Sequence, residues 1–456
     1  MISRVPLAVI GAGPAGLAAV AEARRQDIET ALLDEQMLPG GQIYRGITMA
    51  DPLADPEREE ILGPDYTRGR DLLLREADPG RHDFFGASVW QISSNGRIYF
   101  SRDGKADELH ADRIILATGA LERPMPMPGW TLPGVMGAGA GQTLLKSLGL
   151  VPEGRVVLAG SGPLLWLLTA QYLRAGVDIA ALVETTPAAN ARAAMRYLPG
   201  LLRQRELLGQ GRALLKELRQ SGVQHIKKAS GLAAIGDDQV RALTFKHKGM
   251  AREIPCAHLF LHTGVTPNIQ ITKALGLPHE WDHGQRCWRP RPSPDLPHIH
   301  LVGDGAGIVG ARAAALQGRI AAMKLGDDQA ALGEAEAELR QCLAARAYVD
   351  TLFAPGEEFL DPGDETIVCR CEEVTAGGIR AFAHEGCRDV NQLKAYGRPG
   401  MGPCQGRMCG LVVAEVLSRS LGTTMEDVGY FRLRWPSQPV SMDQLANFAE
   451  GEDAGL

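Results

Sequence analysis

Four cysteines near the end of the chain have the spacing of a metal-ligand set. The sequence has 456 residues and eight cysteines, of which five lie within residues 369–409. Cys369 and Cys371 form a C-x-C pair, and after 32 intervening residues Cys404 and Cys409 form a C-x-x-x-x-C pair. Four thiolates bind a [2Fe–2S] cluster or a structural zinc ion. In a reducing compartment, where disulfides are rare, such a group favours a metal centre over disulfide bonds.

The loop that carries the second pair is rich in glycine. On an α-helix Cys404 and Cys409 would point about 140° apart, whereas Gly402, Pro403 and Gly406 free the loop to bring both sulfurs to one centre. Glycine also leaves backbone N–H groups free to bond sulfides and thiolates. The sequence therefore predicts a [2Fe–2S] cluster held by all four cysteines, with zinc or a set of unliganded thiols as the alternatives.

Basic side chains surround the predicted cluster in the sequence and are candidates to offset its negative charge. The alternative is an ordinary solvated surface. Cys387, the fifth cysteine of the region, is expected to be a small core residue. The basic candidates are Arg370, Arg388, Lys394, Arg398 and Arg407.

The start of the chain has the residues of a phosphate-binding loop. Gly11, Gly13 and Gly16 occupy the three glycine positions of G-x-G-x-x-G, with Pro14 and Ala15 between them. The first glycine permits a tight turn, the second lets backbone amides approach a pyrophosphate, and the third lets helix and strand pack closely. An apolar strand precedes the loop, and a helix from about residue 14 to 25 directs its positive end at the phosphates. This arrangement predicts a dinucleotide site.

An acidic pair, Asp34 and Glu35, ends the second predicted strand, where a carboxylate can accept hydrogen bonds from ribose hydroxyls. Asp34 follows the apolar run directly and is the preferred candidate. Three later patterns belong with this site: "PGGQIYR", the buried strand "RIILATGA", and a strand ending in Gly-Asp before a long helix. Their candidate cofactor-binding residues are Gly41, Gln42, Ala117, Thr118, Gly119, Gly303 and Asp304.

These patterns, in this order, resemble the flavoproteins of the glutathione and thioredoxin reductase type, which have two dinucleotide-binding domains. The resemblance implies FAD, with Asp304 bonding the ribityl chain of the flavin and the helix after it facing the flavin. Neither "PGGQIYR" nor the stretch after Gly160 contains a cysteine pair close in sequence. The redox-active disulfide of those reductases is therefore not expected.

A second strand, turn, helix and strand begin at residue 154. Gly160 and Gly162 match the first two glycines of the nucleotide motif, but Leu165 stands at the third position. Glu184 ends the second strand, where it suits a ribose contact. The leucine is expected to push the helix from the strand or tilt it. The domain is thus interpreted as a site for NAD(P)H, a site for another nucleotide, or a degenerate scaffold.

The composition of the chain limits the partners and the cellular location to be expected. The net charge of −6 gives no reason to expect nucleic acid or an anionic membrane as a partner. Apolar residues make up 45% of the chain without forming an 18-residue run, so an integral membrane protein is not expected. We expect a cytoplasmic protein. No Ser/His/Asp or Cys/His nucleophile pattern is present, so no catalytic residue is assigned.

The elements that position the candidate residues predict an α/β fold. Two dinucleotide-binding domains are followed by a small α-helical domain that holds the cluster, and by a tail that either docks a partner subunit or packs on its own chain. The predicted boundaries are 1–130 with 263–345 for the FAD domain, 131–262 for the second domain, 362–424 for the [2Fe–2S] domain and 425–456 for the tail.

The cysteine-rich region resembles the bacterioferritin-associated-ferredoxin type of [2Fe–2S] domain, which usually closes with C-x-x-C. Nearly the whole chain, including "GGQIYR", "ATGALERP", "DVNQLKAYGRPGMGPCQGRMCG" and "VGYFRLRWPSQPV", resembles one group of proteins. These are the non-substrate subunits of heteromeric amino- and imino-acid dehydrogenases. The group includes the α subunits of hydroxyproline and proline dehydrogenases and the equivalent subunits of opine oxidase and hydrogen cyanide synthase.

This resemblance implies an electron-relay protein that works beside a separate FAD-containing β subunit, which oxidises the amine. In some members it also implies a small ferredoxin-like [2Fe–2S] γ subunit, or an additional flavin, FMN, shared between subunits. If the electron acceptor lies in the inner membrane, we expect this protein to associate with that membrane peripherally. Two alternatives stay open: a self-sufficient NAD(P)H-dependent oxidoreductase, and a non-catalytic nucleotide-binding scaffold.

Overall fold

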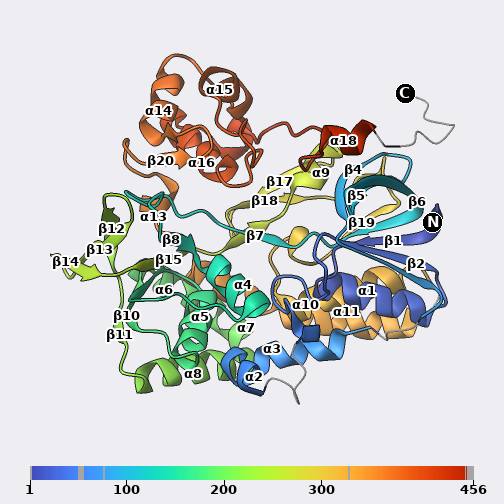
Figure 1. Ribbon diagram of the computed structural model, residues 1–456, viewed down its shortest axis with the longest axis horizontal. Coiled ribbons are helices and arrows are strands. Elements are labelled where there is room, and N and C mark those ends of the chain that lie inside the picture. The colour runs from blue at the N-terminus through green and yellow to red at the C-terminus, as the bar shows by residue number, and fades with distance from the viewer. Residues whose placement is uncertain (1–2, 50–55, 75–77, 327–328, 447, 449–456) are drawn as a thin grey trace.

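The first sheet of the computed structural model surrounds β1 (Arg4–Ile10), which pairs in parallel with strands on both sides (Figure 1). The structure describes residues 3–49, 56–74, 78–326, 329–446 and 448. Leu7, Ala8 and Val9 are fully buried, as expected for a central parallel strand covered on both faces. The order is β3-β2-β1-β6-β5-β4 with β19 beside β6, formed by β2 (Thr30–Asp34), β3 (Arg81–Phe85), β4 (Ser88–Ile92), β5 (Arg97–Arg102), β6 (Lys105–Leu116) and β19 (Ile299–Leu301).

Two helices cross closely beneath this sheet. They are α1 (Pro14–Arg25), as predicted, and α10 (Ala311–Met323). A Cβ at Gly318 would overlap the carbonyl oxygen of Ala15, so glycine is required at this crossing. The helix α11 (Gln329–Leu343) packs on α10 through Ala335. Between β2 and β3 the chain forms η1 (Ile47–Met49), α2 (Pro56–Leu62), α3 (Pro64–Thr67) and η2 (Arg68–Leu72).

The second sheet is all parallel, in the order β11-β10-β9-β15-β8. A two-stranded connection of β7 (Ala120–Glu122) and β16 (Val265–Pro267) links it to the first sheet. The strands are β8 (Val135–Gly137), β9 (Val156–Gly160), β10 (Ile179–Glu184), β11 (Gln224–Ile226) and β15 (His258–His262). The helices are α4 (Ala138–Leu148), α5 (Pro163–Arg174), α6 (Ala188–Ala194), η3 (Met195–Tyr197), α7 (Leu198–Leu202) and α8 (Arg205–Gln220). An antiparallel sheet joins β12 (Ser230–Gly236), β13 (Val240–His247) and β14 (Met250–Pro255).

Short elements follow the return to the first domain. They are α9 (Gln270–Ala274), the hairpin of β17 (His279–Asp282) and β18 (Cys287–Pro290), and η4 (Gly303–Gly305). After α11 come α12 (Arg346–Leu352) and α13 (Glu357–Leu360). The sequence pattern of residues 332–353 is that of one amphipathic helix, but the chain turns at residues 344–345 and forms two helices.

The C-terminal domain is mostly helical and lies above the hairpin in Figure 1. Its core of helix residues is continuous with Ile269, Trp281 and Trp288 of the first domain. Thr375 caps a helix by accepting a hydrogen bond from the N–H of Gly378, a role that threonine commonly takes at this position. The elements are β20 (Ile367–Cys369), β21 (Val374–Thr375), α14 (Ala376–His384), α15 (Val390–Gly397), α16 (Gly410–Leu421) and α17 (Met425–Val428), followed by α18 (Met442–Ala446) near β4 and β5.

The tail after α17 lies on its own chain. Phe431 is buried in the C-terminal core, and the N–H of Ser437 donates to the carbonyl of Trp90 in the first sheet (2.7 Å). Of the two interpretations of the tail, packing on the chain's own body therefore describes residues 430–437. No helix in the described part of the chain is long and apolar enough to cross a membrane.

Candidate functional site

The glycine loop after β1 is built by close backbone contacts. Gly11 has φ of +106°, and a Cβ there would overlap the carbonyl oxygen of Ala117. A Cβ on Gly16 would overlap the carbonyl oxygen of Gly11. Gly13 differs, because the nearest atom to a Cβ at this position is Gly41 Cα at 3.7 Å. Two of the three glycines are therefore required by the fold, and the third leaves open backbone at the start of α1.

The other predicted cofactor residues gather around the same loop. A Cβ at Gly303 would lie 2.9 Å from the Cβ of Ala15. The hydroxyl of Thr118 donates to the carbonyl of Asn268 (3.1 Å), and Gly119, at φ +67°, has no atom within 4 Å of an added Cβ. The strand ends and the loop thus form an open, glycine-lined cradle, which fits the pyrophosphate of a dinucleotide such as FAD.

Asp34 is held within this cradle rather than exposed. Its carboxylate accepts hydrogen bonds from the N–H of Ala12 (2.5 Å) and the N–H of Gln36 (2.7 Å). Burial is the largest influence on its pKa and raises it above the ordinary value. Glu35 is exposed beside it. Asp34 therefore fixes the glycine loop, and both carboxylates remain candidates for a ribose contact.

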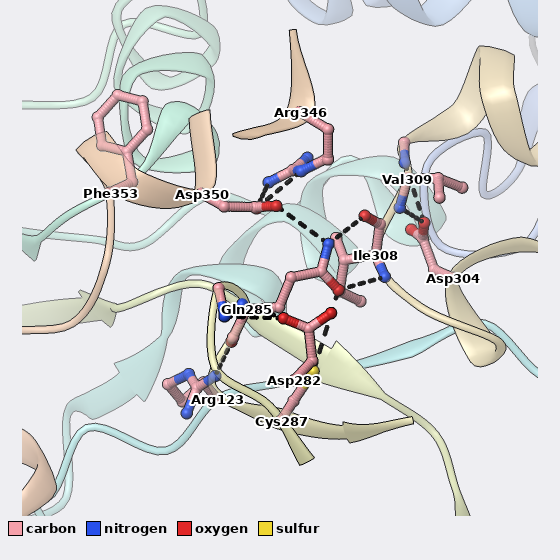
Figure 2. A network of polar contacts seen from close by, with 12 residues as sticks. Arg123, Asp282, Gln285, Cys287, Asp304, Ile308, Val309, Arg346, Asp350 and Phe353 are labelled. Carbon is pink, nitrogen blue, oxygen red and sulfur yellow. Dashed lines mark hydrogen bonds and ion pairs between the residues drawn. The ribbon is translucent and has the colours of Figure 1, made fainter. Parts of the chain in front are cut away.

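Asp304 stands at the start of a loop that its own carboxylate shapes. Asp304 Oδ1 accepts hydrogen bonds from the N–H groups of Val309 (2.7 Å) and Gly310 (3.0 Å). The carboxamide of Gln285 binds Ile308 twice, donating to its carbonyl (2.7 Å) and accepting from its N–H (3.0 Å), as Figure 2 shows. The loop that begins at Asp304 is therefore clamped from the β17–β18 hairpin.

The sequence did not identify Gln285 or a second supporting residue, Lys146. Lys146 is almost fully buried, and its Nζ donates to the carbonyls of Ile43 (2.7 Å) and Gln42 (3.3 Å) and to the carboxamide of Gln142 (2.9 Å). Burial lowers the pKa of Lys146 to about 7. The sequence did contain an indication of this contact, because Gln142 and Lys146 lie four residues apart and therefore on the same side of a helix. Lys146 ties the predicted "GGQIY" segment to the second domain.

The four candidate cysteines are gathered in the C-terminal domain. The thiols of Cys369 and Cys404 lie close enough to the thiol of Cys409 to shift its pKa, and the thiols of Cys371 and Cys404 are neighbours in the same way. Cys369 and Cys409 are buried, whereas Cys371 is exposed. The sequence "TIVCRC" is extended only as far as Cys369, because β20 ends there and the chain turns before Cys371. The turn nevertheless keeps all four sulfurs together.

The pKa values within this group follow from the proximity of the thiols. The neighbouring thiol of Cys409 is the largest cause at both Cys369 and Cys404, and it lowers the pKa of Cys369 to about 6 and that of Cys404 to about 5. The pKa of Cys409 is raised, because ionising it beside these two sulfurs is unfavourable. Two of the four thiols are thus disposed to ionise near neutral pH, as metal ligands must.

Backbone groups around the thiols also suit an anionic centre. N–H groups of Gly400, Glu372 and Cys371 face the sulfur of Cys369, and those of Met408 and Gly406 face that of Cys404. Cys409 is the N-cap of α16, so the positive end of that helix points at the group. Side-chain and backbone donors of this kind are what an iron–sulfur centre requires.

All four cysteines are free thiols in the structure. Among the described residues, no three His, Cys, Asp or Glu side chains are arranged to hold a metal ion. What agrees with a four-thiolate centre is the chemistry of the donors, four cysteine sulfurs on neighbouring segments. A Cβ at Gly402 would overlap the Cβ of Cys371, which explains the glycine in the loop.

Aromatic side chains connect the cysteine loop to the first domain. The ammonium of Lys273 lies over the ring of Trp288 (5.0 Å) and over that of Tyr430 (5.7 Å). Burial lowers the pKa of Lys273 to about 8. Tyr430 packs against Gly410 at the start of α16. A cavity of about 20 Å³ lies between the two domains, lined in part by Trp288, Tyr430 and Arg407.

The second nucleotide motif forms the expected glycine turn, but side chains of the same domain occupy the positions where a nucleotide would bind. Gly160 and Gly162 have φ of +130° and +124°, and both face His262. Glu184 Oε1 accepts from Trp166 Nε1, and Glu184 Oε2 lies 2.6 Å from His225 Nε2. Both carboxylate oxygens that suit a ribose contact therefore already have side-chain partners.

Two family models match this chain. Residues 5–323 match the family described as pyridine nucleotide-disulphide oxidoreductase, and residues 364–448 match the sarcosine oxidase A3 domain. The first match covers both sheets and the glycine cradle. The second covers the cysteine-rich domain and the described part of the tail.

Individual relatives extend along almost the whole chain. The A subunit of opine oxidase from Agrobacterium tumefaciens is 38% identical and covers 97% of this chain and 91% of its own length. Hydrogen cyanide synthase subunit HcnB of Pseudomonas aeruginosa is 34% identical and covers 96% of this chain and 98% of its own length. The crystal structure of L-proline dehydrogenase from P. horikoshii shares the fold, with a TM-score of 0.71 at 20% identity over 98% of this chain and 80% of that chain.

These matches confirm the predicted α/β fold with two nucleotide-type domains and a helical C-terminal domain, and they confirm an oxidoreductase. The family's flavoprotein architecture also agrees with FAD as the cofactor of the first domain. The chain therefore belongs to the pyridine nucleotide-disulphide oxidoreductase family, within the group that contains the A subunit of opine oxidase and hydrogen cyanide synthase subunit HcnB.

Proposed function

We propose that this chain is the electron-transfer subunit of a heteromeric dehydrogenase that oxidises an amino or imino acid. The observation that carries the proposal is the presence of two cofactor-type sites in one chain: the glycine cradle of the first domain and the four gathered cysteines of the last. The names of its relatives, which are subunits of larger enzymes, support partner subunits. Substrate oxidation is assigned to a partner subunit, as the family resemblance implies.

We propose residues for each cofactor from the sequence motifs and the family resemblance. FAD exchanges electrons in pairs or singly, and a [2Fe–2S] cluster carries one electron at a time. The backbone around Gly13 and Gly119 would receive the pyrophosphate, Asp34 or Glu35 would contact the ribose, and Asp304 would contact the ribityl chain, as the resemblance implies. The cluster ligands are Cys369, Cys371, Cys404 and Cys409.

The contact between the two domains supports a relay. The flavin-side segment reaches the C-terminal core directly, because Asn268 bonds Thr118 and Gly119 while its neighbour Ile269 belongs to that core. Trp288 and Tyr430 continue this contact to the start of α16. A packed route of this kind holds the two sites at a fixed separation.

Arg407 is expected to tune the cluster. Its half-buried guanidinium donates to the carbonyl of Cys404 (3.2 Å). Two unit charges roughly 10 Å apart interact by about 1–2 kcal/mol at an effective dielectric constant near 20. Arg407→Met should therefore lower the cluster's reduction potential by about 50 mV, measured by spectroelectrochemistry with EPR detection. Arg388→Met, on an exposed position of the same domain, is the control, and equal shifts in both variants would contradict a specific role for Arg407.

The partner requirement gives a separate prediction. Purified alone, the chain should show no oxidation of hydroxyproline, proline, opines or glycine with an artificial electron acceptor. Activity should appear when native partners are captured by pull-down and the complex is assayed on the same compounds. An FAD-containing β subunit is the expected partner, with a ferredoxin-like γ subunit or a shared FMN as further components. Robust amino-acid oxidation by the isolated chain would overturn this assignment.

A further inference from the structure

A segment of the chain itself lies on the second nucleotide motif. The ring of Phe353 packs edge-on against Trp166 of α5, with ring centroids 5.5 Å apart and an interplanar angle of 81°. The hydroxyl of Ser161, within the turn between Gly160 and Gly162, donates to the carbonyl of Phe353 (3.4 Å). This turn is where a dinucleotide-binding fold places the pyrophosphate. A backbone carbonyl therefore takes the acceptor position that a phosphate oxygen would otherwise have.

The same segment is fixed on its other side by α6. The side-chain amide of Asn190 donates to the carbonyls of Leu352 (3.4 Å) and Ala354 (3.0 Å). Three consecutive residues, 352–354, thus have their carbonyl groups bound by side chains of the second domain. Such a set of acceptors resembles what a bound polar ligand would present.

The ribose end of the motif is closed as well. Glu184 is buried, and its oxygens are taken by the indole of Trp166 and the imidazole of His225, each at 2.6 Å. Trp166 therefore binds Glu184 through its N–H while its ring faces Phe353. A ribose hydroxyl could reach Glu184 only by displacing one of these partners, and the displaced buried N–H would then cost free energy.

We propose that residues 352–354 are the resident ligand of the second nucleotide fold and exclude a nicotinamide dinucleotide from it. The nucleotide surface then serves as a docking site for the chain's own segment. The inference goes beyond the electron-transfer function, and it assigns this domain a structural role in place of a reductant site.

The resident segment is also attached to the flavin side. Asp350 accepts a hydrogen bond from the carboxamide of Gln285 (3.1 Å) and pairs with Arg346 (Nε, 2.7 Å). Gln285 in turn clamps Ile308 in the loop that begins at Asp304. Figure 2 shows the hydrogen bonds that join Asp350 to Gln285 and Gln285 to Ile308, with Phe353 and Asp304 on either side of them. The position of residues 352–354 in the second domain therefore helps to fix the loop that begins at Asp304, which is proposed to face the flavin.

The test measures nucleotide binding to the FAD-loaded, full-length protein by calorimetry with ADP and with NADH. The wild type should show no saturable binding below about 1 mM. Phe353→Ala and Asn190→Ala each remove one anchor of the segment, and both should raise the affinity for ADP by about tenfold or more. Tyr396→Ala removes an exposed aromatic from the C-terminal domain and should leave ADP binding as in the wild type.

Hydrogen exchange distinguishes displacement from binding elsewhere. When ADP binds the Phe353→Ala variant, amides of residues 350–354 should exchange faster and those of residues 161–165 more slowly. Micromolar binding of NADH or ADP to the wild type, with protection of residues 161–165 and unchanged exchange at residues 350–354, would overturn the proposal. Asn190→Ala keeps the test valid if Phe353→Ala fails to fold, since only two hydrogen bonds are removed.

Discussion

Cys404→Ser is expected to abolish the iron–sulfur centre. Cys404 lies beside two of the other three thiols, and N–H groups of Gly406 and Met408 face its sulfur. These neighbours lower the pKa of Cys404, which favours a thiolate ligand, whereas a serine hydroxyl stays protonated and is a harder, weaker ligand for iron. Iron and labile sulfide should fall from about two of each per chain to nearly none, and the brown absorption should disappear while the flavin bands remain.

Cys387 supplies the matched control for this experiment. It is buried in the same core, with 2% of its surface exposed, but no thiol of the group bonds it. Cys387→Ser should therefore keep the wild-type iron and sulfide content. Wild-type stoichiometry in Cys404→Ser would refute the cluster assignment. Stoichiometric zinc without sulfide in the wild type would select the tetrahedral zinc alternative.

Gly13→Val is expected to remove FAD without unfolding the first domain. A Cβ at Gly13 meets only Gly41 Cα at 3.7 Å, which is an ordinary contact, and the backbone there has φ of −78°. The added side chain would instead fill the open cradle proposed for the pyrophosphate. FAD affinity should fall by about a hundredfold or more, roughly 3 kcal/mol, whereas the melting temperature of the apoprotein should change by only a few degrees.

Substitutions at two other glycines serve as controls for Gly13→Val. Gly16→Val should prevent folding, because a Cβ there overlaps the carbonyl oxygen of Gly11. Gly209→Val, in α8 with no atom within 4 Å of an added Cβ, should retain both FAD and stability. Fluorescence titration of apoprotein with FAD, combined with calorimetric melting, separates the three outcomes. FAD bound with wild-type affinity by Gly13→Val would place the flavin elsewhere.

Local patterns predicted the elements well, because local physics determines them. The bounds of α1 and the cap at Thr375 follow from a glycine turn, a proline at the first helical position and a hydroxyl acceptor. The glycine motif predicted which strand ends would meet, since the ends of parallel strands share one edge of a sheet. Nearly full-length resemblance predicted the family.

Contacts between residues distant in the sequence were not predictable in the same way. Gln285 and Ile308 meet only after the hairpin folds over the loop, and Lys146 reaches Gln42 from another domain. Phe353 lies in a segment whose pattern predicted only an amphipathic helix, yet it packs on Trp166. Period and composition specify that such residues are partly buried, but which partner they meet depends on the tertiary arrangement.

The shared core beneath the cysteine domain has a consequence for protein engineering. Ile269, Trp281 and Trp288 belong to the first domain by sequence but to the C-terminal core by packing. Excising residues 362–424 as a portable electron-transfer cassette would leave two indole rings facing water on one side and a hollow on the other. A fusion that transplants this module into a different flavoprotein must therefore carry the β17–β18 hairpin with it as part of the graft.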